Sequence, residues 1–564
     1  MNYDHSIKLF RRICAVGFFI LAGSLFYYQV INGNYYLRRA KNNYVRVIPS
    51  RSIRGTIFDR NNQPLAYDRA AFNIAVIPYQ IRDNKDFLFY NIARYLKCDT
   101  RKLSRNYNRR FQNLFSPIDV ILDIDKATAF KIRGYFGEDV IIDPQPQRYY
   151  PYGLACSHIL GYVKEAAAFY ENLKQYGYTP YERVGFSGIE QYYDSYLRGE
   201  DGGDLIEVNS KGKIVGFLGN QNAQRGADIS LTVDYRIQEI AYRALEGRRG
   251  TLILMNSKNG EILSLVSFPA YDPNNFIKGK DVEQYLTGTN KPMHNRAVQS
   301  AYPLGSTFKP IVATAALGEE KISPSTTFMC TGEMRLGNTQ FRCEKEHGPE
   351  NLYQGLAHSC NVYFYNLGLL VGRDKICEWA ARFGLNTPTN IDLPYEKKGI
   401  IPTQNFLSGR QWYRGDTLNL SIGQGYTESS PMEIMCAINV FATGGYLVKP
   451  RLLKKIGTSP SEEIRITDIG VAVRTLEIVK KALIDVVNSD DGTARILKPL
   501  SLDIAGKTGT AQAKGGSHGW FVGFFPYNAP QYTICIFLEN AGSSYEALKV
   551  AHTFLEKLKE QKLL

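Results

Sequence analysis

The stretch Tyr302-Pro-Leu-Gly-Ser-Thr-Phe-Lys-Pro310 decides how the rest of this chain is interpreted. It leads into an apolar run at 311–317, which predicts a helix that begins near Ser306 and Lys309. Three residues are close to one helical turn, so the lysine is expected on the same face as the serine, within reach of its hydroxyl. A serine hydroxyl is a poor nucleophile until a base takes its proton, and a lysine is such a base once burial lowers its pKa. The alternative is a plain serine-capped helix start, because Ser-x-x-Lys also arises by chance in long chains.

Two further motifs follow in order, Ser359-Cys360-Asn361 and Lys507-Thr508-Gly509-Thr510. Ser-x-x-Lys, Ser-x-Asn and Lys-Thr-Gly, in this order, are the signature of the serine enzymes that penicillin acylates. A single Lys-Thr-Gly is also expected as a surface turn. The ordered set, with each motif in a suitable local context, indicates a serine acyl-transfer site.

Composition is compatible with several classes of partner. The chain has 564 residues, 44% of them hydrophobic and 22% charged, which predicts two to four domains and a large core. The formal net charge of +14 would suit nucleic acid, but the basic residues are scattered and no nucleic-acid motif accompanies them. An anionic membrane surface or cell-wall polymer explains the excess as well. We therefore expect no nucleic-acid partner.

An apolar segment near the N-terminus predicts a membrane anchor. Residues 13–31 carry no charge, and nineteen residues at about 1.5 Å each nearly span a bilayer core. A cleaved signal peptide is the competitor, but the only small-residue pattern, Ala22-Gly-Ser24, lies in the middle of the run. Basic residues flank both ends of the segment, so its orientation follows from the chemistry, whose substrate lies outside the cytoplasm.

The remaining chain reads as two regions. Residues 35–227 contain many turns and short strands and no catalytic constellation, which predicts a spacer or interaction module. From residue 228 the pattern changes, with hairpins expected at 251–267 and 518–538 and a final helix begun by a capping box at Ser543 and Glu546. Strands at both ends with helices between predict an α+β domain, in which helices cover both faces of one antiparallel sheet.

The chain resembles the class B penicillin-binding proteins over nearly its whole length. The stretches that carry the resemblance, besides the three motifs, are 54–60, 148–163, 188–190, 228–234 and 422–425. Within the family it is most similar to the elongation-type members, penicillin-binding protein 2, through 207–209, 271–273, 295–296 and 302–305. Septal members are the alternative. The resemblance implies a cytoplasmic tail (1–12), a transmembrane anchor (13–31), a non-catalytic pedestal (35–227) and a transpeptidase domain (228–564).

The resemblance also implies D,D-transpeptidation of peptidoglycan, with a D,D-carboxypeptidase side activity. Ser306 would attack the penultimate D-Ala of a stem peptide, and Lys309 would take its proton. Ser359 would relay a proton to the leaving amine, and Asn361 would bind a substrate amide or orient the lysine.

The third motif would bind the end of the substrate. Lys507 and Thr508 would hold its terminal carboxylate, and Gly509 would let the strand approach the substrate closely. The backbone N–H groups of Ser306 and Thr510 would form the oxyanion hole.

The implied partners are stem peptides, β-lactams, a SEDS-type glycosyltransferase with other elongation-complex proteins, and the inner membrane, with the catalytic domain in the periplasm. Acyl transfer needs no cofactor. A β-lactamase is disfavoured, because no Glu between Asn361 and Lys507 has an Asn four residues later, the spacing that class A enzymes use. A non-enzymatic alternative is a scaffold protein whose transpeptidase domain is inert. The intact serine, both lysines and the asparagine of the motifs argue against it.

Four residues near the second motif form a candidate metal site. Cys330, Cys343, His347 and Cys360 offer three thiolates and one imidazole, a set that makes a closed tetrahedral zinc site. A disulfide between Cys330 and Cys343, with Cys360 simply buried, is the competing interpretation. Some relatives of penicillin-binding protein 2 carry metal-ligand residues in this region, which favours structural zinc. The other cysteines are expected to be packing residues.

Overall fold

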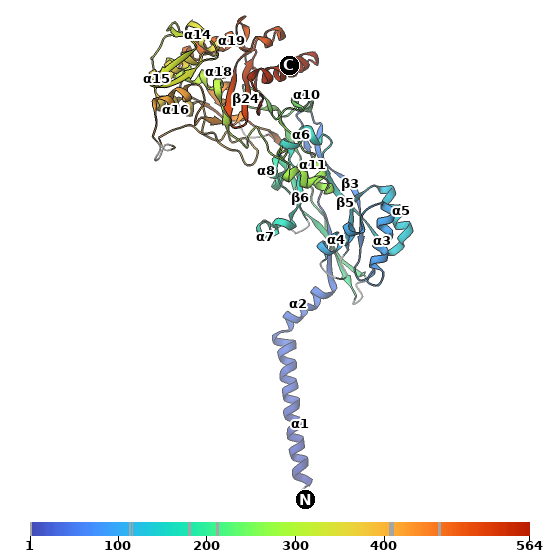
Figure 1. The fold of residues 1–564 in the computed structure, drawn as a ribbon. Helices are drawn as coiled ribbons and strands as arrows, with labels where there is room; N and C mark the ends of the chain where they lie inside the picture. The colour runs from blue at the N-terminus through green and yellow to red at the C-terminus, as the bar shows by residue number, and fades with distance from the viewer. Residues whose placement is uncertain are drawn as a thin grey trace. The chain divides into compact units, whose positions relative to one another are not determined.

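The computed structural model describes residues 3–564 except 112, 113, 115, 116, 179–181, 210–213, 405, 407–410 and 461–463. The chain forms two compact units that interleave along the sequence (Figure 1). Unit 1 contains Met1–Arg54, Ala70–Gln147 and Gly199–Gly226, and unit 2 contains Gly55–Arg69, Arg148–Arg198 and Ala227–Leu564. Two segments of the region expected as a pedestal, 55–69 and 148–198, therefore fold with the C-terminal part of the chain.

Unit 1 begins with the expected apolar helix. Helix α1 (Tyr3–Phe26) continues as a π-helix, η1 (Tyr27–Ile31), and is followed by α2 (Gly33–Tyr44). The span Asp4–Ile31 is long and apolar enough to cross a membrane, and none of it is buried against the protein. An apolar face without protein contacts is what a helix in lipid requires, so this span fits the predicted anchor.

Further along, the described residues of unit 1 form two groups of paired strands and several helices. Strands β1 (Val45–Ser50), β8 (Gly202–Val208) and β9 (Ile214–Gln221) form an antiparallel sheet in the order β1-β8-β9. The end of β3 (Pro64–Val76) pairs with β4 (Ile118–Ile124) and β5 (Ile141–Tyr149). Helices α3 (Lys85–Leu96), α4 (Thr100–Arg110) and α5 (Lys126–Phe136) contribute to a separate apolar core with these strands.

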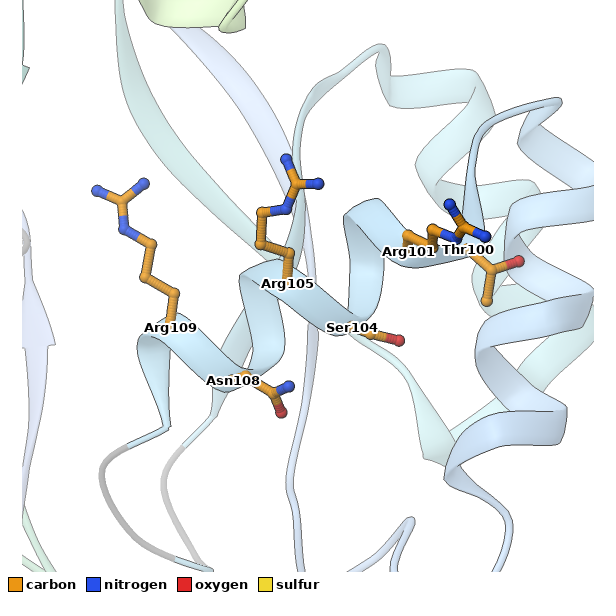
Figure 2. A pocket seen from close by; sticks show the side chains of 6 residues that line it. All are labelled: Thr100, Arg101, Ser104, Arg105, Asn108 and Arg109. Carbon is orange, nitrogen blue, oxygen red and sulfur yellow. The ribbon is translucent and has the colours of Figure 1, made fainter.

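Helix α4 concentrates basic charge that the sequence alone suggested was scattered. Its eleven residues include five basic side chains and no acidic one. Figure 2 shows Arg101, Arg105 and Arg109 standing along one side of the helix, while Ser104 and Asn108 lie on the other side in this view. Successive arginines are four residues apart, so they are neighbours on the helix surface.

Unit 2 is built on a five-stranded antiparallel sheet, as the sequence predicts. The strand order is β12-β11-β25-β24-β23, which places β23 at an edge. The strands are β11 (Gly250–Asn256), β12 (Ile262–Phe268), β23 (Ala505–Ala513), β24 (Gly516–Phe525) and β25 (Tyr532–Leu538). Both predicted hairpins, β11–β12 and β24–β25, are present with antiparallel pairing.

Helices cover both faces of this sheet, which confirms the predicted fold class. Helices α10 (Tyr235–Leu245) and α20 (Ser544–Glu560) share one apolar core with the sheet. A larger core on the other side contains the helices α13 (Lys309–Gly318), α15 (Asn361–Val371), α16 (Arg373–Arg382) and α18 (Pro431–Thr443) and most of α19 (Val473–Asn488). The smaller elements of unit 2 include β2 (Ile57–Phe58), α6 (Gly153–Leu160), α8 (Gly188–Tyr192), α9 (Asp194–Leu197), β10 (Ile229–Leu231), α14 (Leu352–Ala357), α17 (Arg414–Ser421) and β20 (Leu453–Ile456).

A buried ion pair joins segments of unit 2 that lie far apart in the sequence. Arg148 donates from Nε to Glu190 at 2.6 Å and from Nη1 to the carbonyl oxygen of Gly55 at 2.8 Å. Both charged side chains are almost fully buried, and Asp68 lies 3.4 Å from the same guanidinium. Three of the stretches that carry the family resemblance therefore meet at one point.

The predicted capping box of the last helix is wrong. Ser543 is the residue before α20, but its side chain makes no capping hydrogen bond. The backbone N–H of Ser544 instead donates to Thr510 Oγ1 at 3.1 Å, and Glu546 pairs with Lys549 at 2.5 Å. A hydroxyl from strand β23 thus accepts from the first N–H of the helix, whereas the expected box would have used the N–H of Glu546.

Candidate active site

Ser306 lies in a 3₁₀ turn, η5 (Gly305–Phe308), that leads into α13. Gly305 has a φ of +54°, a conformation that favours glycine, and a Cβ there would lie 2.5 Å from the carbonyl oxygen of Thr510. Its N–H donates to the carbonyl oxygen of Gly423 at 2.9 Å. The turn is therefore held between strand β23 and the 422–425 loop, and the half-buried Ser306 sits on it.

Lys309 is fully buried, and its amine reaches the second motif. Its Nζ lies 2.6 Å from the carbonyl oxygen of Ser359, 3.2 Å from the hydroxyl of Ser359 and 2.8 Å from Oδ1 of Asn361. Among the described residues, no hydrogen bond joins Lys309 to the Ser306 hydroxyl. Catalytic hydrogen bonds in unliganded enzymes often tighten only when substrate binds, so this arrangement is compatible with a base one turn from the serine.

The second motif turns sharply into helix α15. Ser359 has a φ of +56°, which is rare for a residue other than glycine, and such strained residues cluster at functional sites. Cys360 caps the helix, and its sulfur accepts from the N–H of Tyr363 at 3.4 Å. Asn361 donates from its side chain to the carbonyl oxygen of Arg342 at 3.2 Å, which turns its Oδ1 toward Lys309.

The third motif lies on the edge strand β23 beside the Ser306 turn. Lys507 is fully buried, and its Nζ lies 3.1 Å from the carbonyl oxygen of Thr508 and 3.5 Å from the hydroxyl of Thr508. A Cβ at Gly509 would lie 2.8 Å from Thr307 and 3.0 Å from the carbonyl oxygen of Leu304. Glycine at 509 is therefore needed because the Ser306 turn packs closely against the strand. The sequence suggested a different reason, the close approach of substrate.

Burial changes the proton affinity of both lysines. Removal from water lowers the pKa of Lys309 to about 8, although nearby Cys343 and Cys360 act in the opposite direction. Burial also holds the pKa of Lys507 well below its ordinary value, and the positive charge of Lys309 adds to this effect. A substantial fraction of Lys309 is therefore neutral near pH 8, as a proton acceptor must be.

The four predicted metal ligands come together behind the second motif. The ligand atoms of Cys330, Cys343, His347 and Cys360 all lie within 4.8 Å of one another. His347 Nδ1 is 3.5 Å from each of the sulfurs of Cys330 and Cys343, and the sulfurs of Cys343 and Cys360 are 4.0 Å apart. None of the nine cysteines forms a disulfide, including Cys330 and Cys343.

This cluster fits a closed zinc site. A tetrahedral zinc ion with bonds of about 2.3 Å to sulfur holds its ligand atoms roughly 3.8 Å apart, close to the distances present here. The contact between the two sulfurs lowers the pKa of Cys343 and raises the pKa of Cys360. The cluster is also tied to the active site, because the N–H of Asn361 donates to the sulfur of Cys343 at 3.2 Å.

The structure brings all the predicted catalytic and substrate-binding residues into one region of unit 2. It also shows neighbours that the sequence did not single out. Thr493 lies 2.9 Å from the Thr508 hydroxyl, and His358 lies between Glu350 and Asp491. Thr493 follows Asp491 and Gly492, a pattern that indicates an ordinary turn, so no local signal would have identified it.

Comparison with known proteins supports the family that the three motifs predicted. The sequence profile of the penicillin binding protein transpeptidase domain matches residues 250–560, and that of the penicillin-binding protein dimerisation domain matches residues 49–231. The chain is 30% identical to the peptidoglycan D,D-transpeptidase MrdA of Haemophilus influenzae, over 99% of this chain and 93% of the relative. It is 31% identical to MrdA of Escherichia coli K12, over 96% of this chain and 93% of the relative.

The fold of this chain is also similar to that of a solved structure from the same family. The complex between penicillin-binding protein PBP2 and MreC from Helicobacter pylori superimposes with a TM-score of 0.81 at 28% identity, over 92% of this chain and 99% of that one. The chain therefore belongs to the class B penicillin-binding protein family, as its motifs predict. Within that family its relatives are of the penicillin-binding protein 2 type.

Proposed function

We propose that this protein is a peptidoglycan D,D-transpeptidase of cell-wall elongation that works through an acyl-enzyme on Ser306. The observation that carries the proposal is the position of the buried Lys309 amine, one turn from Ser306 and in contact with Ser359 and Asn361. Its lowered pKa provides a neutral amine near pH 8. A buried amine with a lowered pKa, one turn from a serine hydroxyl, is suited to accepting and returning a proton.

The residues suggest a two-step reaction. Ser306 Oγ forms a bond to the carbonyl carbon of the penultimate D-Ala, and its proton passes to Lys309. Ser359 relays a proton to the departing amine, so that the C–N bond breaks and the terminal D-Ala leaves. The amine of a neighbouring stem peptide then attacks the acyl-enzyme: its nitrogen forms the amide bond of the cross-link, the ester bond to Ser306 Oγ breaks, and the proton of the amine returns to Ser306 through Lys309. Water in place of the amine gives the D,D-carboxypeptidase side reaction.

The third motif supplies the groups that hold the substrate. Lys507 and Thr508 bind the terminal carboxylate of the stem peptide, and the carboxylate of a β-lactam takes the same place. The backbone N–H groups of Ser306 and Thr510 stabilise the developing oxyanion, which is often the largest single contribution to such reactions. No step of this chemistry needs a cofactor.

The setting of the enzyme follows from its family and its anchor. Residues 13–31 of the Asp4–Ile31 helix would hold it in the inner membrane, with residues 1–12 in the cytoplasm, 35–227 as the pedestal and 228–564 as the periplasmic catalytic domain. A SEDS-type glycosyltransferase would supply the glycan, and an MreC-type protein is proposed as a partner because a relative was solved with one. Depletion in living cells would separate elongation from division, since rounding indicates the former and filamentation the latter.

Labelling with a fluorescent penicillin tests the acyl-enzyme. The wild-type chain should be labelled covalently, and mass spectrometry should place the adduct on Ser306. Ser306→Ala should abolish labelling with little change in thermal stability, because the missing hydroxyl leaves no large cavity. An unlabelled wild-type protein would instead support an inert scaffold.

A structural zinc ion is part of the proposal. Cys330, Cys343, Cys360 and His347 would hold it, and it would clamp the loop at 330–347 to the element that carries Ser359 and Asn361. Metal analysis of the purified full chain should find one zinc ion per molecule, and Cys360→Ser should lose it. Cys377→Ser, a buried cysteine outside the cluster, is the matched control and should keep it. A metal-free protein with two fewer free thiols than expected would establish the disulfide instead.

A further inference from the structure

The loop between α19 and the short 3₁₀ helix η6 (Arg495–Leu500) connects the second motif to the third. The backbone N–H of Thr493 donates to the carbonyl oxygen of Ala357 at 3.2 Å, two residues before Ser359. Asp491 lies 2.6 Å from Nε2 of His358, the residue next to Ser359. The loop is therefore fixed by a backbone hydrogen bond and a side-chain contact to the segment that enters the second motif.

The hydroxyl of Thr493, in the same loop, contacts the third motif at Thr508. Thr508 donates from its hydroxyl to Thr493 Oγ1 at 2.9 Å. Thr508 is almost completely buried and Thr493 is half-buried, so this contact lies at the edge of the site rather than in open solvent. The contact joins the loop to strand β23 across fifteen residues of sequence.

The hydrogen-bonding capacity of the Thr493 and Thr508 hydroxyls suits them to binding a carboxylate together. Each hydroxyl has one proton to donate and can accept two hydrogen bonds, whereas a carboxylate can only accept. When a carboxylate accepts the proton of Thr508, that threonine can no longer donate to Thr493. The Thr493 hydroxyl can then donate to Thr508 in return, so that the contact between the two side chains is kept with its direction reversed. A chain of donors that points toward an anion strengthens the last bond of the chain.

We propose that Thr493 is a positioning residue for carboxylate recognition, which acts by orienting the Thr508 hydroxyl toward the substrate. The inference rests on the proposed function, in which Thr508 binds the terminal carboxylate. It adds a residue outside the three motifs, and it gives the 489–494 loop a role in selecting substrates that end in a carboxylate. Lys507 supplies the charge, while the two hydroxyls supply the directional contact.

Rates of acylation by two probes test the proposal. Benzylpenicillin carries the carboxylate, and its methyl ester does not. Thr493→Val keeps the shape of the side chain and removes the hydroxyl, and it should lower the second-order rate constant with benzylpenicillin about 3- to 10-fold, the range expected for one neutral hydrogen bond. With the ester the loss should be less than about twofold. Thr493→Ser, which restores the hydroxyl, should recover the wild-type rate with both probes.

A double-mutant cycle separates positioning from general structure. In a Thr508→Val background, Thr493→Val should cause no further loss with benzylpenicillin, because its effect passes through the Thr508 hydroxyl. Thr493→Ala serves as a second hydroxyl-free variant and should show the same preference between the probes. Equal losses with both probes, additive effects in the cycle, or no loss with either variant would each overturn the inference. A wild-type protein that benzylpenicillin does not acylate would overturn the proposed function itself and this inference with it.

Discussion

The positive charges of this protein occupy two contrasting environments. In unit 2, Lys309 and Lys507 are fully buried and contact named groups of the catalytic motifs. In unit 1, Arg101 and Arg105 of α4 are exposed, and in the part of the chain that the structure describes neither side chain has an ion-pair partner. Both sets consist of basic side chains, but water surrounds only those on α4, and burial lowers the pKa of the two lysines.

The comparison shows that burial, rather than charge, makes a cation chemically useful. Removing an ammonium group from water costs free energy, which the protein recovers only through specific contacts and a lowered pKa. An exposed arginine keeps its hydration and contributes little to stability. Changes in the buried set should therefore have large effects on activity or folding, and changes on α4 should have small ones.

Replacement of Lys309 should have the largest effect. Lys309→Met keeps most of the buried volume and removes the base, so acylation by penicillin should slow by about 10²- to 10⁴-fold, the usual contribution of a general base. Stopped-flow or gel measurement of labelling rates checks this. Lys375→Met replaces a half-exposed lysine on α16 and is the control, which should react at the wild-type rate. Comparable rates for the two variants would contradict the assignment of Lys309 as the base.

The buried ion pair should come next. Glu190→Gln removes the nearer of the two carboxylates beside the buried Arg148 guanidinium and leaves Asp68, so the free energy of unfolding should fall by about 3 kcal/mol, the lower end of the cost of breaking a buried pair. Glu378→Gln removes one of the two carboxylate partners of Lys375, from a pair in which both side chains are about half exposed, and it should cost less than about 1 kcal/mol. Denaturant titrations of both variants give the two numbers. Equal costs would mean that burial does not control the strength of these pairs.

The pH dependence of acylation should show the lowered pKa directly. The base must be neutral, and the pKa of Lys309 is lowered to about 8. Below that pH the lysine is protonated, so the rate should fall about tenfold for each pH unit as the pH decreases, and it should level off above pH 8. Rates measured with benzylpenicillin between pH 6 and 9 check the direction. A rate that is flat or rises toward low pH would contradict a neutral lysine base.

Much of the fold and site could be predicted because the signals are local. The two hairpins of the sheet are set by alternating strands and short turns, and Ser306 and Lys309 are one turn apart. The spacing of Cys343 and His347 likewise predicts that both reach one ligand position. In each case the interacting residues are close in sequence, so backbone geometry alone limits where their side chains can lie.

What the sequence could not predict depends on distant contacts. The Thr510 hydroxyl accepts from the N–H of Ser544 at the start of α20, because strand β23 brings it there, and no pattern near Ser543 shows this. The amine of Lys309 is held by Ser359 and Asn361, which are about fifty residues away. The interleaving of the two units has the same origin. Arg148 donates to the carbonyl oxygen of Gly55, which joins 55–69 to 148–198, and Asn274 donates to the carbonyl oxygen of Tyr150, which joins 148–198 to the main part of unit 2.

The smallest effect is expected on α4. Arg105→Gln removes one charge from the row formed with Arg101 and Arg109 and keeps a long side chain with good helix propensity. Like charges four residues apart repel one another, so the free energy of unfolding should change by less than about 0.5 kcal/mol and is expected to rise rather than fall. Acylation by penicillin should be unchanged, because the helix belongs to unit 1 and the motifs belong to unit 2. Thermal unfolding and labelling of the same preparation measure both quantities, and a loss of several kcal/mol would show that this arginine, although exposed, is held by contacts as strong as those of the buried cations.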